Sequence, residues 1–165
     1  MNLYDEITLN RIKLLHPNYR EQIKLWYLEI NRKLPKGVRL RFTHTYRSIE
    51  EQNKLFNQRP KVTNAKGGQS IHNYGLAFDI VILFDKDNNG TFETASFTVD
   101  KYWLQVAEFF KSKGFVWGGD WSSFKDYPHF EVKGYKWQDL QKMKTFDCGG
   151  IKYHGIKYVF FYRKF

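Results

Sequence analysis

An aspartate lies inside an apolar segment of this sequence, and a histidine stands shortly before it. Asp79 interrupts GLAFDIVILF, and His72 precedes it by seven residues in SIHNYGLAFD. A buried carboxylate without a partner is strongly destabilising. Because side chains of a strand alternate between its two faces, Asp79 would point away from the face that carries Phe78 and Ile80. The pattern therefore favours a cleft position for Asp79.

A second histidine stands in DYPHFEV, residues 126–132, and Asp126 lies three residues before it. His129 and Glu131 would share one face of a strand. Together with His72 and Asp79, His129 completes two histidines and one carboxylate, and three such ligands with an open fourth position are the composition of a catalytic zinc site. Asp126 would then be a free carboxylate able to accept a proton from water. Spacing alone leaves the alternative of a structural histidine–aspartate pair open.

An acidic loop, DKDNNGTFE at residues 85–93, is a candidate for a second metal. Asp85, Asp87 and Asn89 match the start of the D-x-[DN]-x-[DN]-G calcium loop. Its twelfth position is Ser96, where a calcium loop has a bidentate glutamate. A Ca²⁺ ion there would brace the end of the strand that carries Asp79. The alternative is a solvated hairpin turn.

The elements expected around these residues do not follow a regular strand–helix–strand repeat. Helices are expected over residues 5–15, 18–34, 48–56, 101–114 and 137–144, and strands over 39–47, 75–84, 91–99 and 129–134. Ser48 and Glu51 have the spacing of a capping box at the start of the third helix. This order predicts an α+β fold.

The length, net charge and cysteine content of the chain limit the number of domains and the kinds of molecule that it could bind. The chain has 165 residues, 42% of them apolar, which suits one domain, and its net charge of +10 indicates an anionic partner such as nucleic acid, a membrane surface or an acidic wall polymer. The charge could also serve solubility alone. A single cysteine, Cys148, excludes an intrachain disulfide. No secretory signal peptide or membrane span is expected, so we predict synthesis in the cytoplasm and action outside the cell only after release.

The segment SIHNYGLAFD resembles the S-x-H-x-x-G-x-A-x-D signature of the zinc D,D-carboxypeptidase and L-alanyl-D-glutamate peptidase family, which includes VanY-like carboxypeptidases and phage endolysins (peptidase family M15). DYPHFE is similar to the second motif of that family, (D/E)-x-x-H. TYRSIEEQNKLF resembles its upstream Y-R-S-x-x-x-Q segment. The matches run in family order from about residue 39 to residue 133, and the tail from about residue 145 is unmatched.

The resemblance implies roles for particular residues. It implies that zinc is bound by His72, Asp79 and His129. It implies that Asp126 is the general base, that Arg47 faces the developing oxyanion, and that Ser70 holds substrate or orders the site. From the residues alone, Arg47 could instead pair with Glu50 or Glu51, and Ser70 could be a turn residue.

The resemblance also implies a fold and an activity. The fold would be one compact α+β domain of the Hedgehog/DD-peptidase type over residues 1–165, with helices on a small antiparallel sheet and an added hairpin at about 145–165. The activity would be hydrolysis of the L-Ala–D-Glu bond of peptidoglycan by an enzyme of phage or prophage type that adsorbs to anionic wall polymers. The alternatives are a D-Ala–D-Ala carboxypeptidase and a non-catalytic wall-binding module. Nucleic-acid binding is not expected, because no recognition motif supports it, and the oligomeric state is left open.

Overall fold

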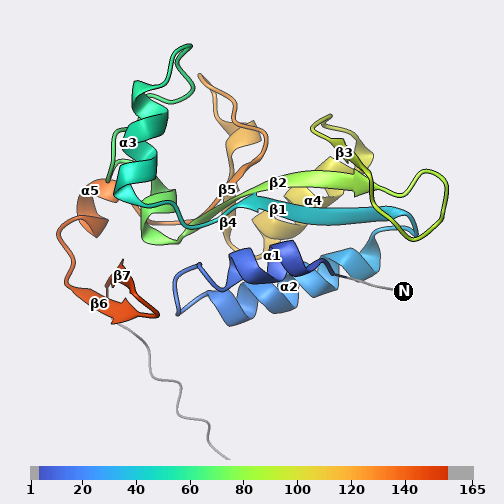
Figure 1. Cartoon of the computed structure of the whole chain (residues 1–165), viewed down its shortest axis with the longest axis horizontal. Coiled ribbons are helices and arrows are strands. Elements are labelled where there is room, and N and C mark those ends of the chain that lie inside the picture. The colour runs from blue at the N-terminus through green and yellow to red at the C-terminus, as the bar shows by residue number, and fades with distance from the viewer. Residues whose placement is uncertain (1–3, 156–165) are drawn as a thin grey trace, which may run out of the picture.

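The computed structural model describes residues 4–155, and its fold is α+β (Figure 1). The main sheet is antiparallel, with the strand order β1-β2-β5-β4, and β3 pairs with the far end of β2. Its strands are β1 (Val38–His44), β2 (Ala77–Phe84), β3 (Thr94–Ser96), β4 (Phe115–Trp117) and β5 (His129–Val132). This order places β2 between β1 and β5, so residues of β2 have neighbours on both sides.

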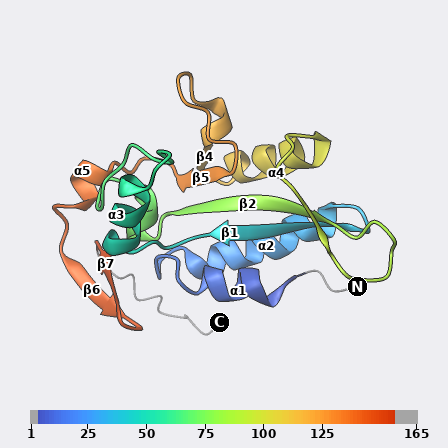
Figure 2. The ribbon, with the colours of Figure 1, turned by 45° about the horizontal axis from the view of Figure 1, so that its top comes forward.

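Three helices and one face of the sheet form the main core. They are α1 (Glu6–Ile12), α2 (Arg20–Lys33) and α4 (Lys101–Ser112). Alternate residues of β2, Phe78 and Ile80, are fully buried in this core, as the alternation in the sequence predicts. Phe78 stacks on Phe42 of β1 with ring centroids 4.2 Å apart. Figures 1 and 2 both draw α1 and α2 on the opposite side of β1 and β2 from the β4–β5 connection.

The second face of β2 is more covered than the sequence suggests. Ala77, Val81 and Leu83 share this face with Asp79, yet all three are at most 3% exposed. The side chain of Asp79 is 17% exposed. The opening on this face is therefore local to Asp79.

Shorter elements frame that opening. They are α3 (Ile49–Asn57), the 3₁₀ helices η1 (Ile71–Tyr74) and η2 (Gly118–Asp120), and α5 (Trp137–Leu140). The expected capping box at the start of α3 is confirmed, because the Glu51 backbone donates to the Ser48 hydroxyl and the Ser48 backbone donates to the Glu51 carboxylate. The strand β4 was not expected, since three residues between a helix and a glycine pair carry no detectable alternation.

The described part of the tail forms the hairpin β6 (Thr145–Cys148) and β7 (Ile151–His154). Tyr153 is buried and its hydroxyl donates to the carbonyl oxygen of Leu14 at 2.8 Å. The hairpin therefore packs on the connection between α1 and α2, while residues 156–165 lie outside the described part of the chain. Among residues 4–155, no helix combines the length and the apolar character that crossing a membrane requires.

Candidate active site

Strand pairing places Asp79 between His129 and His44. In the antiparallel register, Asp79 lies opposite His129 of β5 on one side and opposite His44 of β1 on the other. Directly opposed residues of antiparallel strands have Cβ atoms about 5 Å apart, so their side chains can meet. His72 reaches the same point from η1, the turn that precedes β2. The structure thus brings together the three residues that the sequence singles out as metal ligands.

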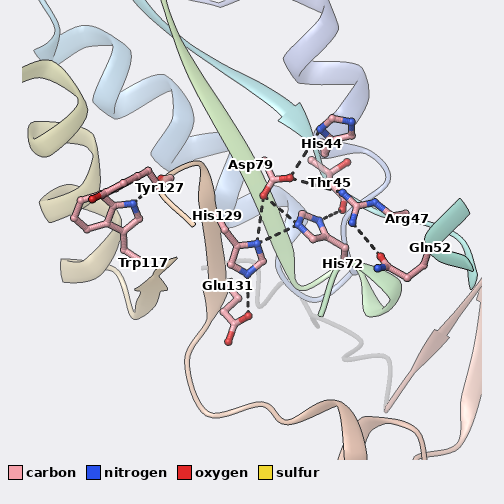
Figure 3. Close-up of polar contacts among 10 residues, drawn as sticks. All are labelled: His44, Thr45, Arg47, Gln52, His72, Asp79, Trp117, Tyr127, His129 and Glu131. Atoms are coloured by element: carbon pink, nitrogen blue, oxygen red, sulfur yellow. Dashed lines mark hydrogen bonds and ion pairs between the residues drawn. The ribbon is translucent and has the colours of Figure 1, made fainter. Parts of the chain in front are cut away.

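The three side chains converge closely (Figure 3). His72 Nε2 lies 3.1 Å from Asp79 Oδ1, His129 Nδ1 lies 3.3 Å from the same oxygen, and the two nitrogens are 3.2 Å apart. Donors placed tetrahedrally at about 2.1 Å from a zinc ion lie about 3.4 Å from one another. The spacing of this donor set therefore fits one tetrahedral metal ion, with the fourth corner left for solvent or substrate.

The outer ring nitrogens of both histidines already have partners. His72 Nδ1 is 2.7 Å from the carbonyl oxygen of Thr45, which can only accept, so this nitrogen carries a hydrogen. His129 Nε2 is 2.9 Å from a carboxylate oxygen of Glu131. With hydrogens on the outer nitrogens, the inner nitrogens and Asp79 Oδ1 are three electron-rich atoms facing one another. Such a group is stabilised by a cation, either a proton on an imidazole or a metal ion.

The pKa values of the cluster reflect the same arrangement. Burial would raise the pKa of Asp79, but the charges and hydrogen bonds of His72 and His129 outweigh it and hold this pKa well below its usual range. Burial opposes the charged form of His129, yet Asp79 and Glu131 raise its pKa to about 9. The cluster therefore favours positive charge at its centre.

Asp126 lies at the end of the β4–β5 connection. Its carboxylate accepts no hydrogen bond from another residue of the described chain, and burial raises its pKa, with Asp79 adding to the effect. The backbone N–H of Asp126 donates to the carbonyl oxygen of Gly118 at 3.1 Å. A side chain at Gly118 would collide with the backbone of Asp126, so the close approach requires glycine. An available carboxylate beside the cluster has the properties of a general base.

Arg47 lies on the β1–α3 connection and faces the cluster. Its Nη2 is 3.8 Å from Asp79 Oδ2, and its Nη1 donates to Gln52 Oε1 at 3.0 Å. Gln52 is buried and also donates to the carbonyl oxygen of Ala65 at 2.8 Å. The expected alternative pairing of Arg47 with Glu50 or Glu51 is not formed, since neither glutamate makes an ion pair with Arg47. The guanidinium is therefore held beside the cluster of His72, Asp79 and His129.

A cleft of about 800 Å³ lies next to the cluster, on the side of His44 and Arg47, the two residues that approach Asp79 Oδ2. Its lining includes His44, Tyr46, Arg47 and the face of α3 that carries Asn53 and Lys54. Trp121 stands near His129, with ring centroids 5.3 Å apart. Ser70 precedes η1, where its backbone N–H donates to the Asn73 side chain. That position is a turn position, and a role for Ser70 in substrate binding stays a prediction.

The acidic loop at residues 85–93 is separate from this cluster. Asp85, Asp87 and Glu93 lie close enough to hold an ion. Their oxygens already accept hydrogen bonds within the loop: Asp85 from the Asn89 and Gly90 backbones, Asp87 from Asn89, and Glu93 from the Lys86 backbone. A turn closed by its own hydrogen bonds accounts for the acidic residues without Ca²⁺, and calcium binding at Asp85, Asp87 and Asn89 gains no support.

Two residues that contact the cluster were not predicted as part of the site. Glu131 binds His129, and His44 Nδ1 lies 3.9 Å from Asp79 Oδ2. Burial lowers the pKa of His44, which favours its neutral form. The spacing of His129 and Glu131, two positions apart on one strand, was the available signal for Glu131.

Comparisons with known proteins agree with this geometry. The family described as D-alanyl-D-alanine carboxypeptidase matches residues 63–132, which include all three residues of the cluster and Asp126. The peptidoglycan L-alanyl-D-glutamate endopeptidase CwlK of Bacillus subtilis (strain 168) is 43% identical over 109 residues, 59% of this chain and 62% of the relative. The L-alanyl-D-glutamate peptidase of Listeria phage A118 is 37% identical over 101 residues, 60% of this chain and 33% of the relative.

A solved structure supports the fold. The crystal structure of the L-Ala D-Glu endopeptidase ChiX of Serratia marcescens superposes with a TM-score of 0.57 at 22% identity, and the match covers 79% of this chain and 89% of that one. The chain spans about three fifths of CwlK and a third of the phage peptidase. The motif region of the chain, residues 63–132, is thus similar to the D-alanyl-D-alanine carboxypeptidase family, and the chain is similar to two L-alanyl-D-glutamate peptidases.

Proposed function

We propose that this protein is a zinc peptidase that hydrolyses the L-Ala–D-Glu bond in the stem peptide of peptidoglycan. The observation that carries the proposal is the convergence of His72, Asp79 and His129 at the spacing of a tetrahedral metal site. The choice of bond is supported by two curated relatives, both of which are named as L-alanyl-D-glutamate peptidases.

The residues around the cluster have different roles in the proposed hydrolysis. Zinc, when bound, contributes Lewis acidity toward the peptide carbonyl and lowers the pKa of a water molecule. Asp126 takes the proton from the attacking water and later gives it to the leaving amine. Arg47 faces the negative charge that develops on the carbonyl oxygen, and a charged donor of this kind is stronger in the transition state than in the ground state.

The net charge of +10 supports action at the bacterial wall. Anionic wall polymers attract a basic protein over distances of about 8 Å at physiological salt. We infer that adsorption to such polymers brings the enzyme to its substrate after release from the producing cell, as the phage relative suggests.

A second candidate is removal of the terminal D-Ala, which the description of the matched family names. Mass spectrometry of peptides released from sacculi of defined chemistry separates the candidates. Cleavage between L-Ala and D-Glu creates a new amino terminus on D-Glu, and this is the expected result. Release of free D-alanine would replace the proposal with the carboxypeptidase, and tight binding to sacculi with no released peptide would replace it with a wall-binding module.

A further inference from the structure

Glu131 contacts the candidate metal ligand His129 from the side opposite the cluster (Figure 3). Its Oε2 lies 2.9 Å from His129 Nε2, while Nδ1 of the same ring faces His72 and Asp79. His129 is buried, and the side chain of Glu131 is 21% exposed. The only hydrogen-bond or ion-pair partner that the described residues offer the Glu131 carboxylate is His129.

The strand fixes this contact. His129 and Glu131 are two positions apart on β5, so both side chains project from one face. The cross-strand neighbour of Glu131 on β2 is Ala77, whose methyl group is the smallest side chain available after glycine. The carboxylate can therefore lean along the strand toward the imidazole.

The contact determines two properties of the imidazole that the metal site needs. Half a turn of the imidazole about its Cβ–Cγ bond would put a carbon atom where Nε2 now meets Glu131 and another where Nδ1 now faces the cluster. The hydrogen bond between Nε2 and Glu131 therefore selects the ring orientation that presents Nδ1 to the cluster. A carboxylate also favours a hydrogen on Nε2, and that tautomer leaves the lone pair on Nδ1. The ring of His72 is fixed in the opposite sense, with its hydrogen on Nδ1 and Nε2 facing the cluster, by the backbone carbonyl of Thr45, which no substitution removes.

We propose that Glu131 is a positioning residue that fixes the ring orientation and the tautomer of His129 for metal binding. This inference rests on the proposed function, because it assumes that the cluster holds zinc. Glu131 is not itself a ligand in this arrangement: its carboxylate meets the far end of the imidazole and is absent from the group of converging donor atoms. For the same reason it does not act as the base, a role that belongs to Asp126.

The test measures zinc affinity by competition with a chelator of known affinity, for the wild type, Glu131→Gln and Glu131→Ala. Loss of such outer partners weakens metal binding about 10–100-fold. We expect a loss in that range for Glu131→Ala and a smaller loss for Glu131→Gln, whose amide oxygen can still accept from Nε2–H without the charge. Glu108→Ala is the matched control, because it removes an exposed carboxylate on α4 whose one ion-pair partner among residues 4–155 is Lys111; it should bind zinc like the wild type.

A second measurement reads the tautomer directly. Long-range ¹H–¹⁵N spectra of the zinc-free wild type and the zinc-free Glu131→Ala protein, recorded above the His129 pKa of about 9 so that the ring is neutral, should show the hydrogen on Nε2 in the wild type and a mixture of tautomers in the variant. Zinc affinities of both Glu131 variants within twofold of the wild type would overturn the inference, and the Gln variant keeps this outcome accessible if the Ala variant does not fold. A wild type that fails to bind zinc would overturn the proposed function as well, so the two failures are distinct.

Discussion

In the proposed mechanism, three residues of the site hold zinc and a fourth, Asp126, transfers a proton. Removing an imidazole ligand, as in His72→Ala or His129→Ala, should weaken zinc binding by more than about 100-fold, beyond the loss caused by an outer partner alone.

Asp126→Ala should keep zinc and lower turnover by roughly 10²–10⁴, the usual contribution of a general base. Competition with a chelator measures the zinc affinity of all three variants, and the rate at which peptides are released from the wall measures their turnover. Normal cleavage by Asp126→Ala would remove Asp126 from the mechanism.

Arg47 should affect turnover without affecting the metal. Its guanidinium faces Asp79 Oδ2 at 3.8 Å, too far for a direct hydrogen bond, and is held by Gln52. Loss of one preorganised donor at a developing oxyanion costs about 10²–10³ in kcat. We therefore expect Arg47→Met to lower kcat in that range and to change zinc affinity by less than about threefold. The matched control is Arg59→Met in the loop after α3, whose guanidinium donates to the backbone carbonyls of Phe56 and Gln58. A kcat unchanged in Arg47→Met would contradict the assignment.

At this scale the sequence predicts residue types better than it predicts their partners. The histidines, Asp79 and Asp126 stand in motifs with recognisable spacing, and the structure brings the two histidines and Asp79 together. Their partners could not be predicted in the same way. The carbonyl of Thr45 meets His72 across 27 positions of the chain, and such a contact depends on strand pairing rather than on local pattern.

At the scale of elements, the β4–β5 connection decides where Asp126 lies. Gly118 and Asp126 pack backbone against backbone, and an added methyl group at Gly118 must displace one of them. Gly118→Ala should therefore reduce turnover, about 10-fold or more since a misplacement of about 1 Å can cost 10²-fold. Zinc binding should persist, because the three donor atoms lie on η1, β2 and β5. Ser122→Ala, an exposed change in the same connection, is the control; equal turnover for both variants would contradict the role of Gly118.

The long elements were predictable and the short ones were not. Apolar alternation over residues 75–84 predicts a strand, and β2 occupies Ala77–Phe84. The capping residues of α3 predict its start. By contrast, β4 has three residues, and the burial of Val81 and Leu83 comes from the packing of distant segments. The single-domain assignment of residues 1–165 stays a prediction.

At the scale of the whole molecule, the positive charge predicts salt-dependent adsorption. Raising the ionic strength shortens the range of electrostatic attraction from about 10 Å at 0.1 M to about 3 Å at 1 M. Binding to sacculi should therefore decrease with salt, measured by co-sedimentation of the Asp126→Ala protein. Cleavage of a small soluble stem peptide should change much less, because it needs no adsorption. Binding that resists 1 M salt would contradict an electrostatic origin.

The stability of the whole fold should depend on pH through His16, which joins the hairpin β6–β7 to the rest of the molecule. Its Nε2 donates to the carbonyl oxygen of His154 at 3.0 Å, and its Nδ1 accepts from the Asn18 backbone at 3.3 Å, so the buried ring is neutral. Burial lowers the pKa of His16, and the nearby Arg20 acts in the same direction. The unfolded chain, with an ordinary pKa of about 6.5, then binds the proton more readily than the folded chain.

The stability that neutral His16 gives the folded protein is therefore complete above the ordinary histidine pKa of about 6.5. This stability is lost as the pH falls below that pKa. His129 has the opposite shift, so the effect must be isolated by a variant. His16→Asn should be less stable than the wild type at about pH 7.5, and the gap should narrow by about pH 5.5, below the ordinary histidine pKa. Denaturant unfolding of both zinc-loaded proteins at the two pH values measures the gap. A gap that stays constant or widens toward low pH would show that His16 does not stay neutral in the folded protein.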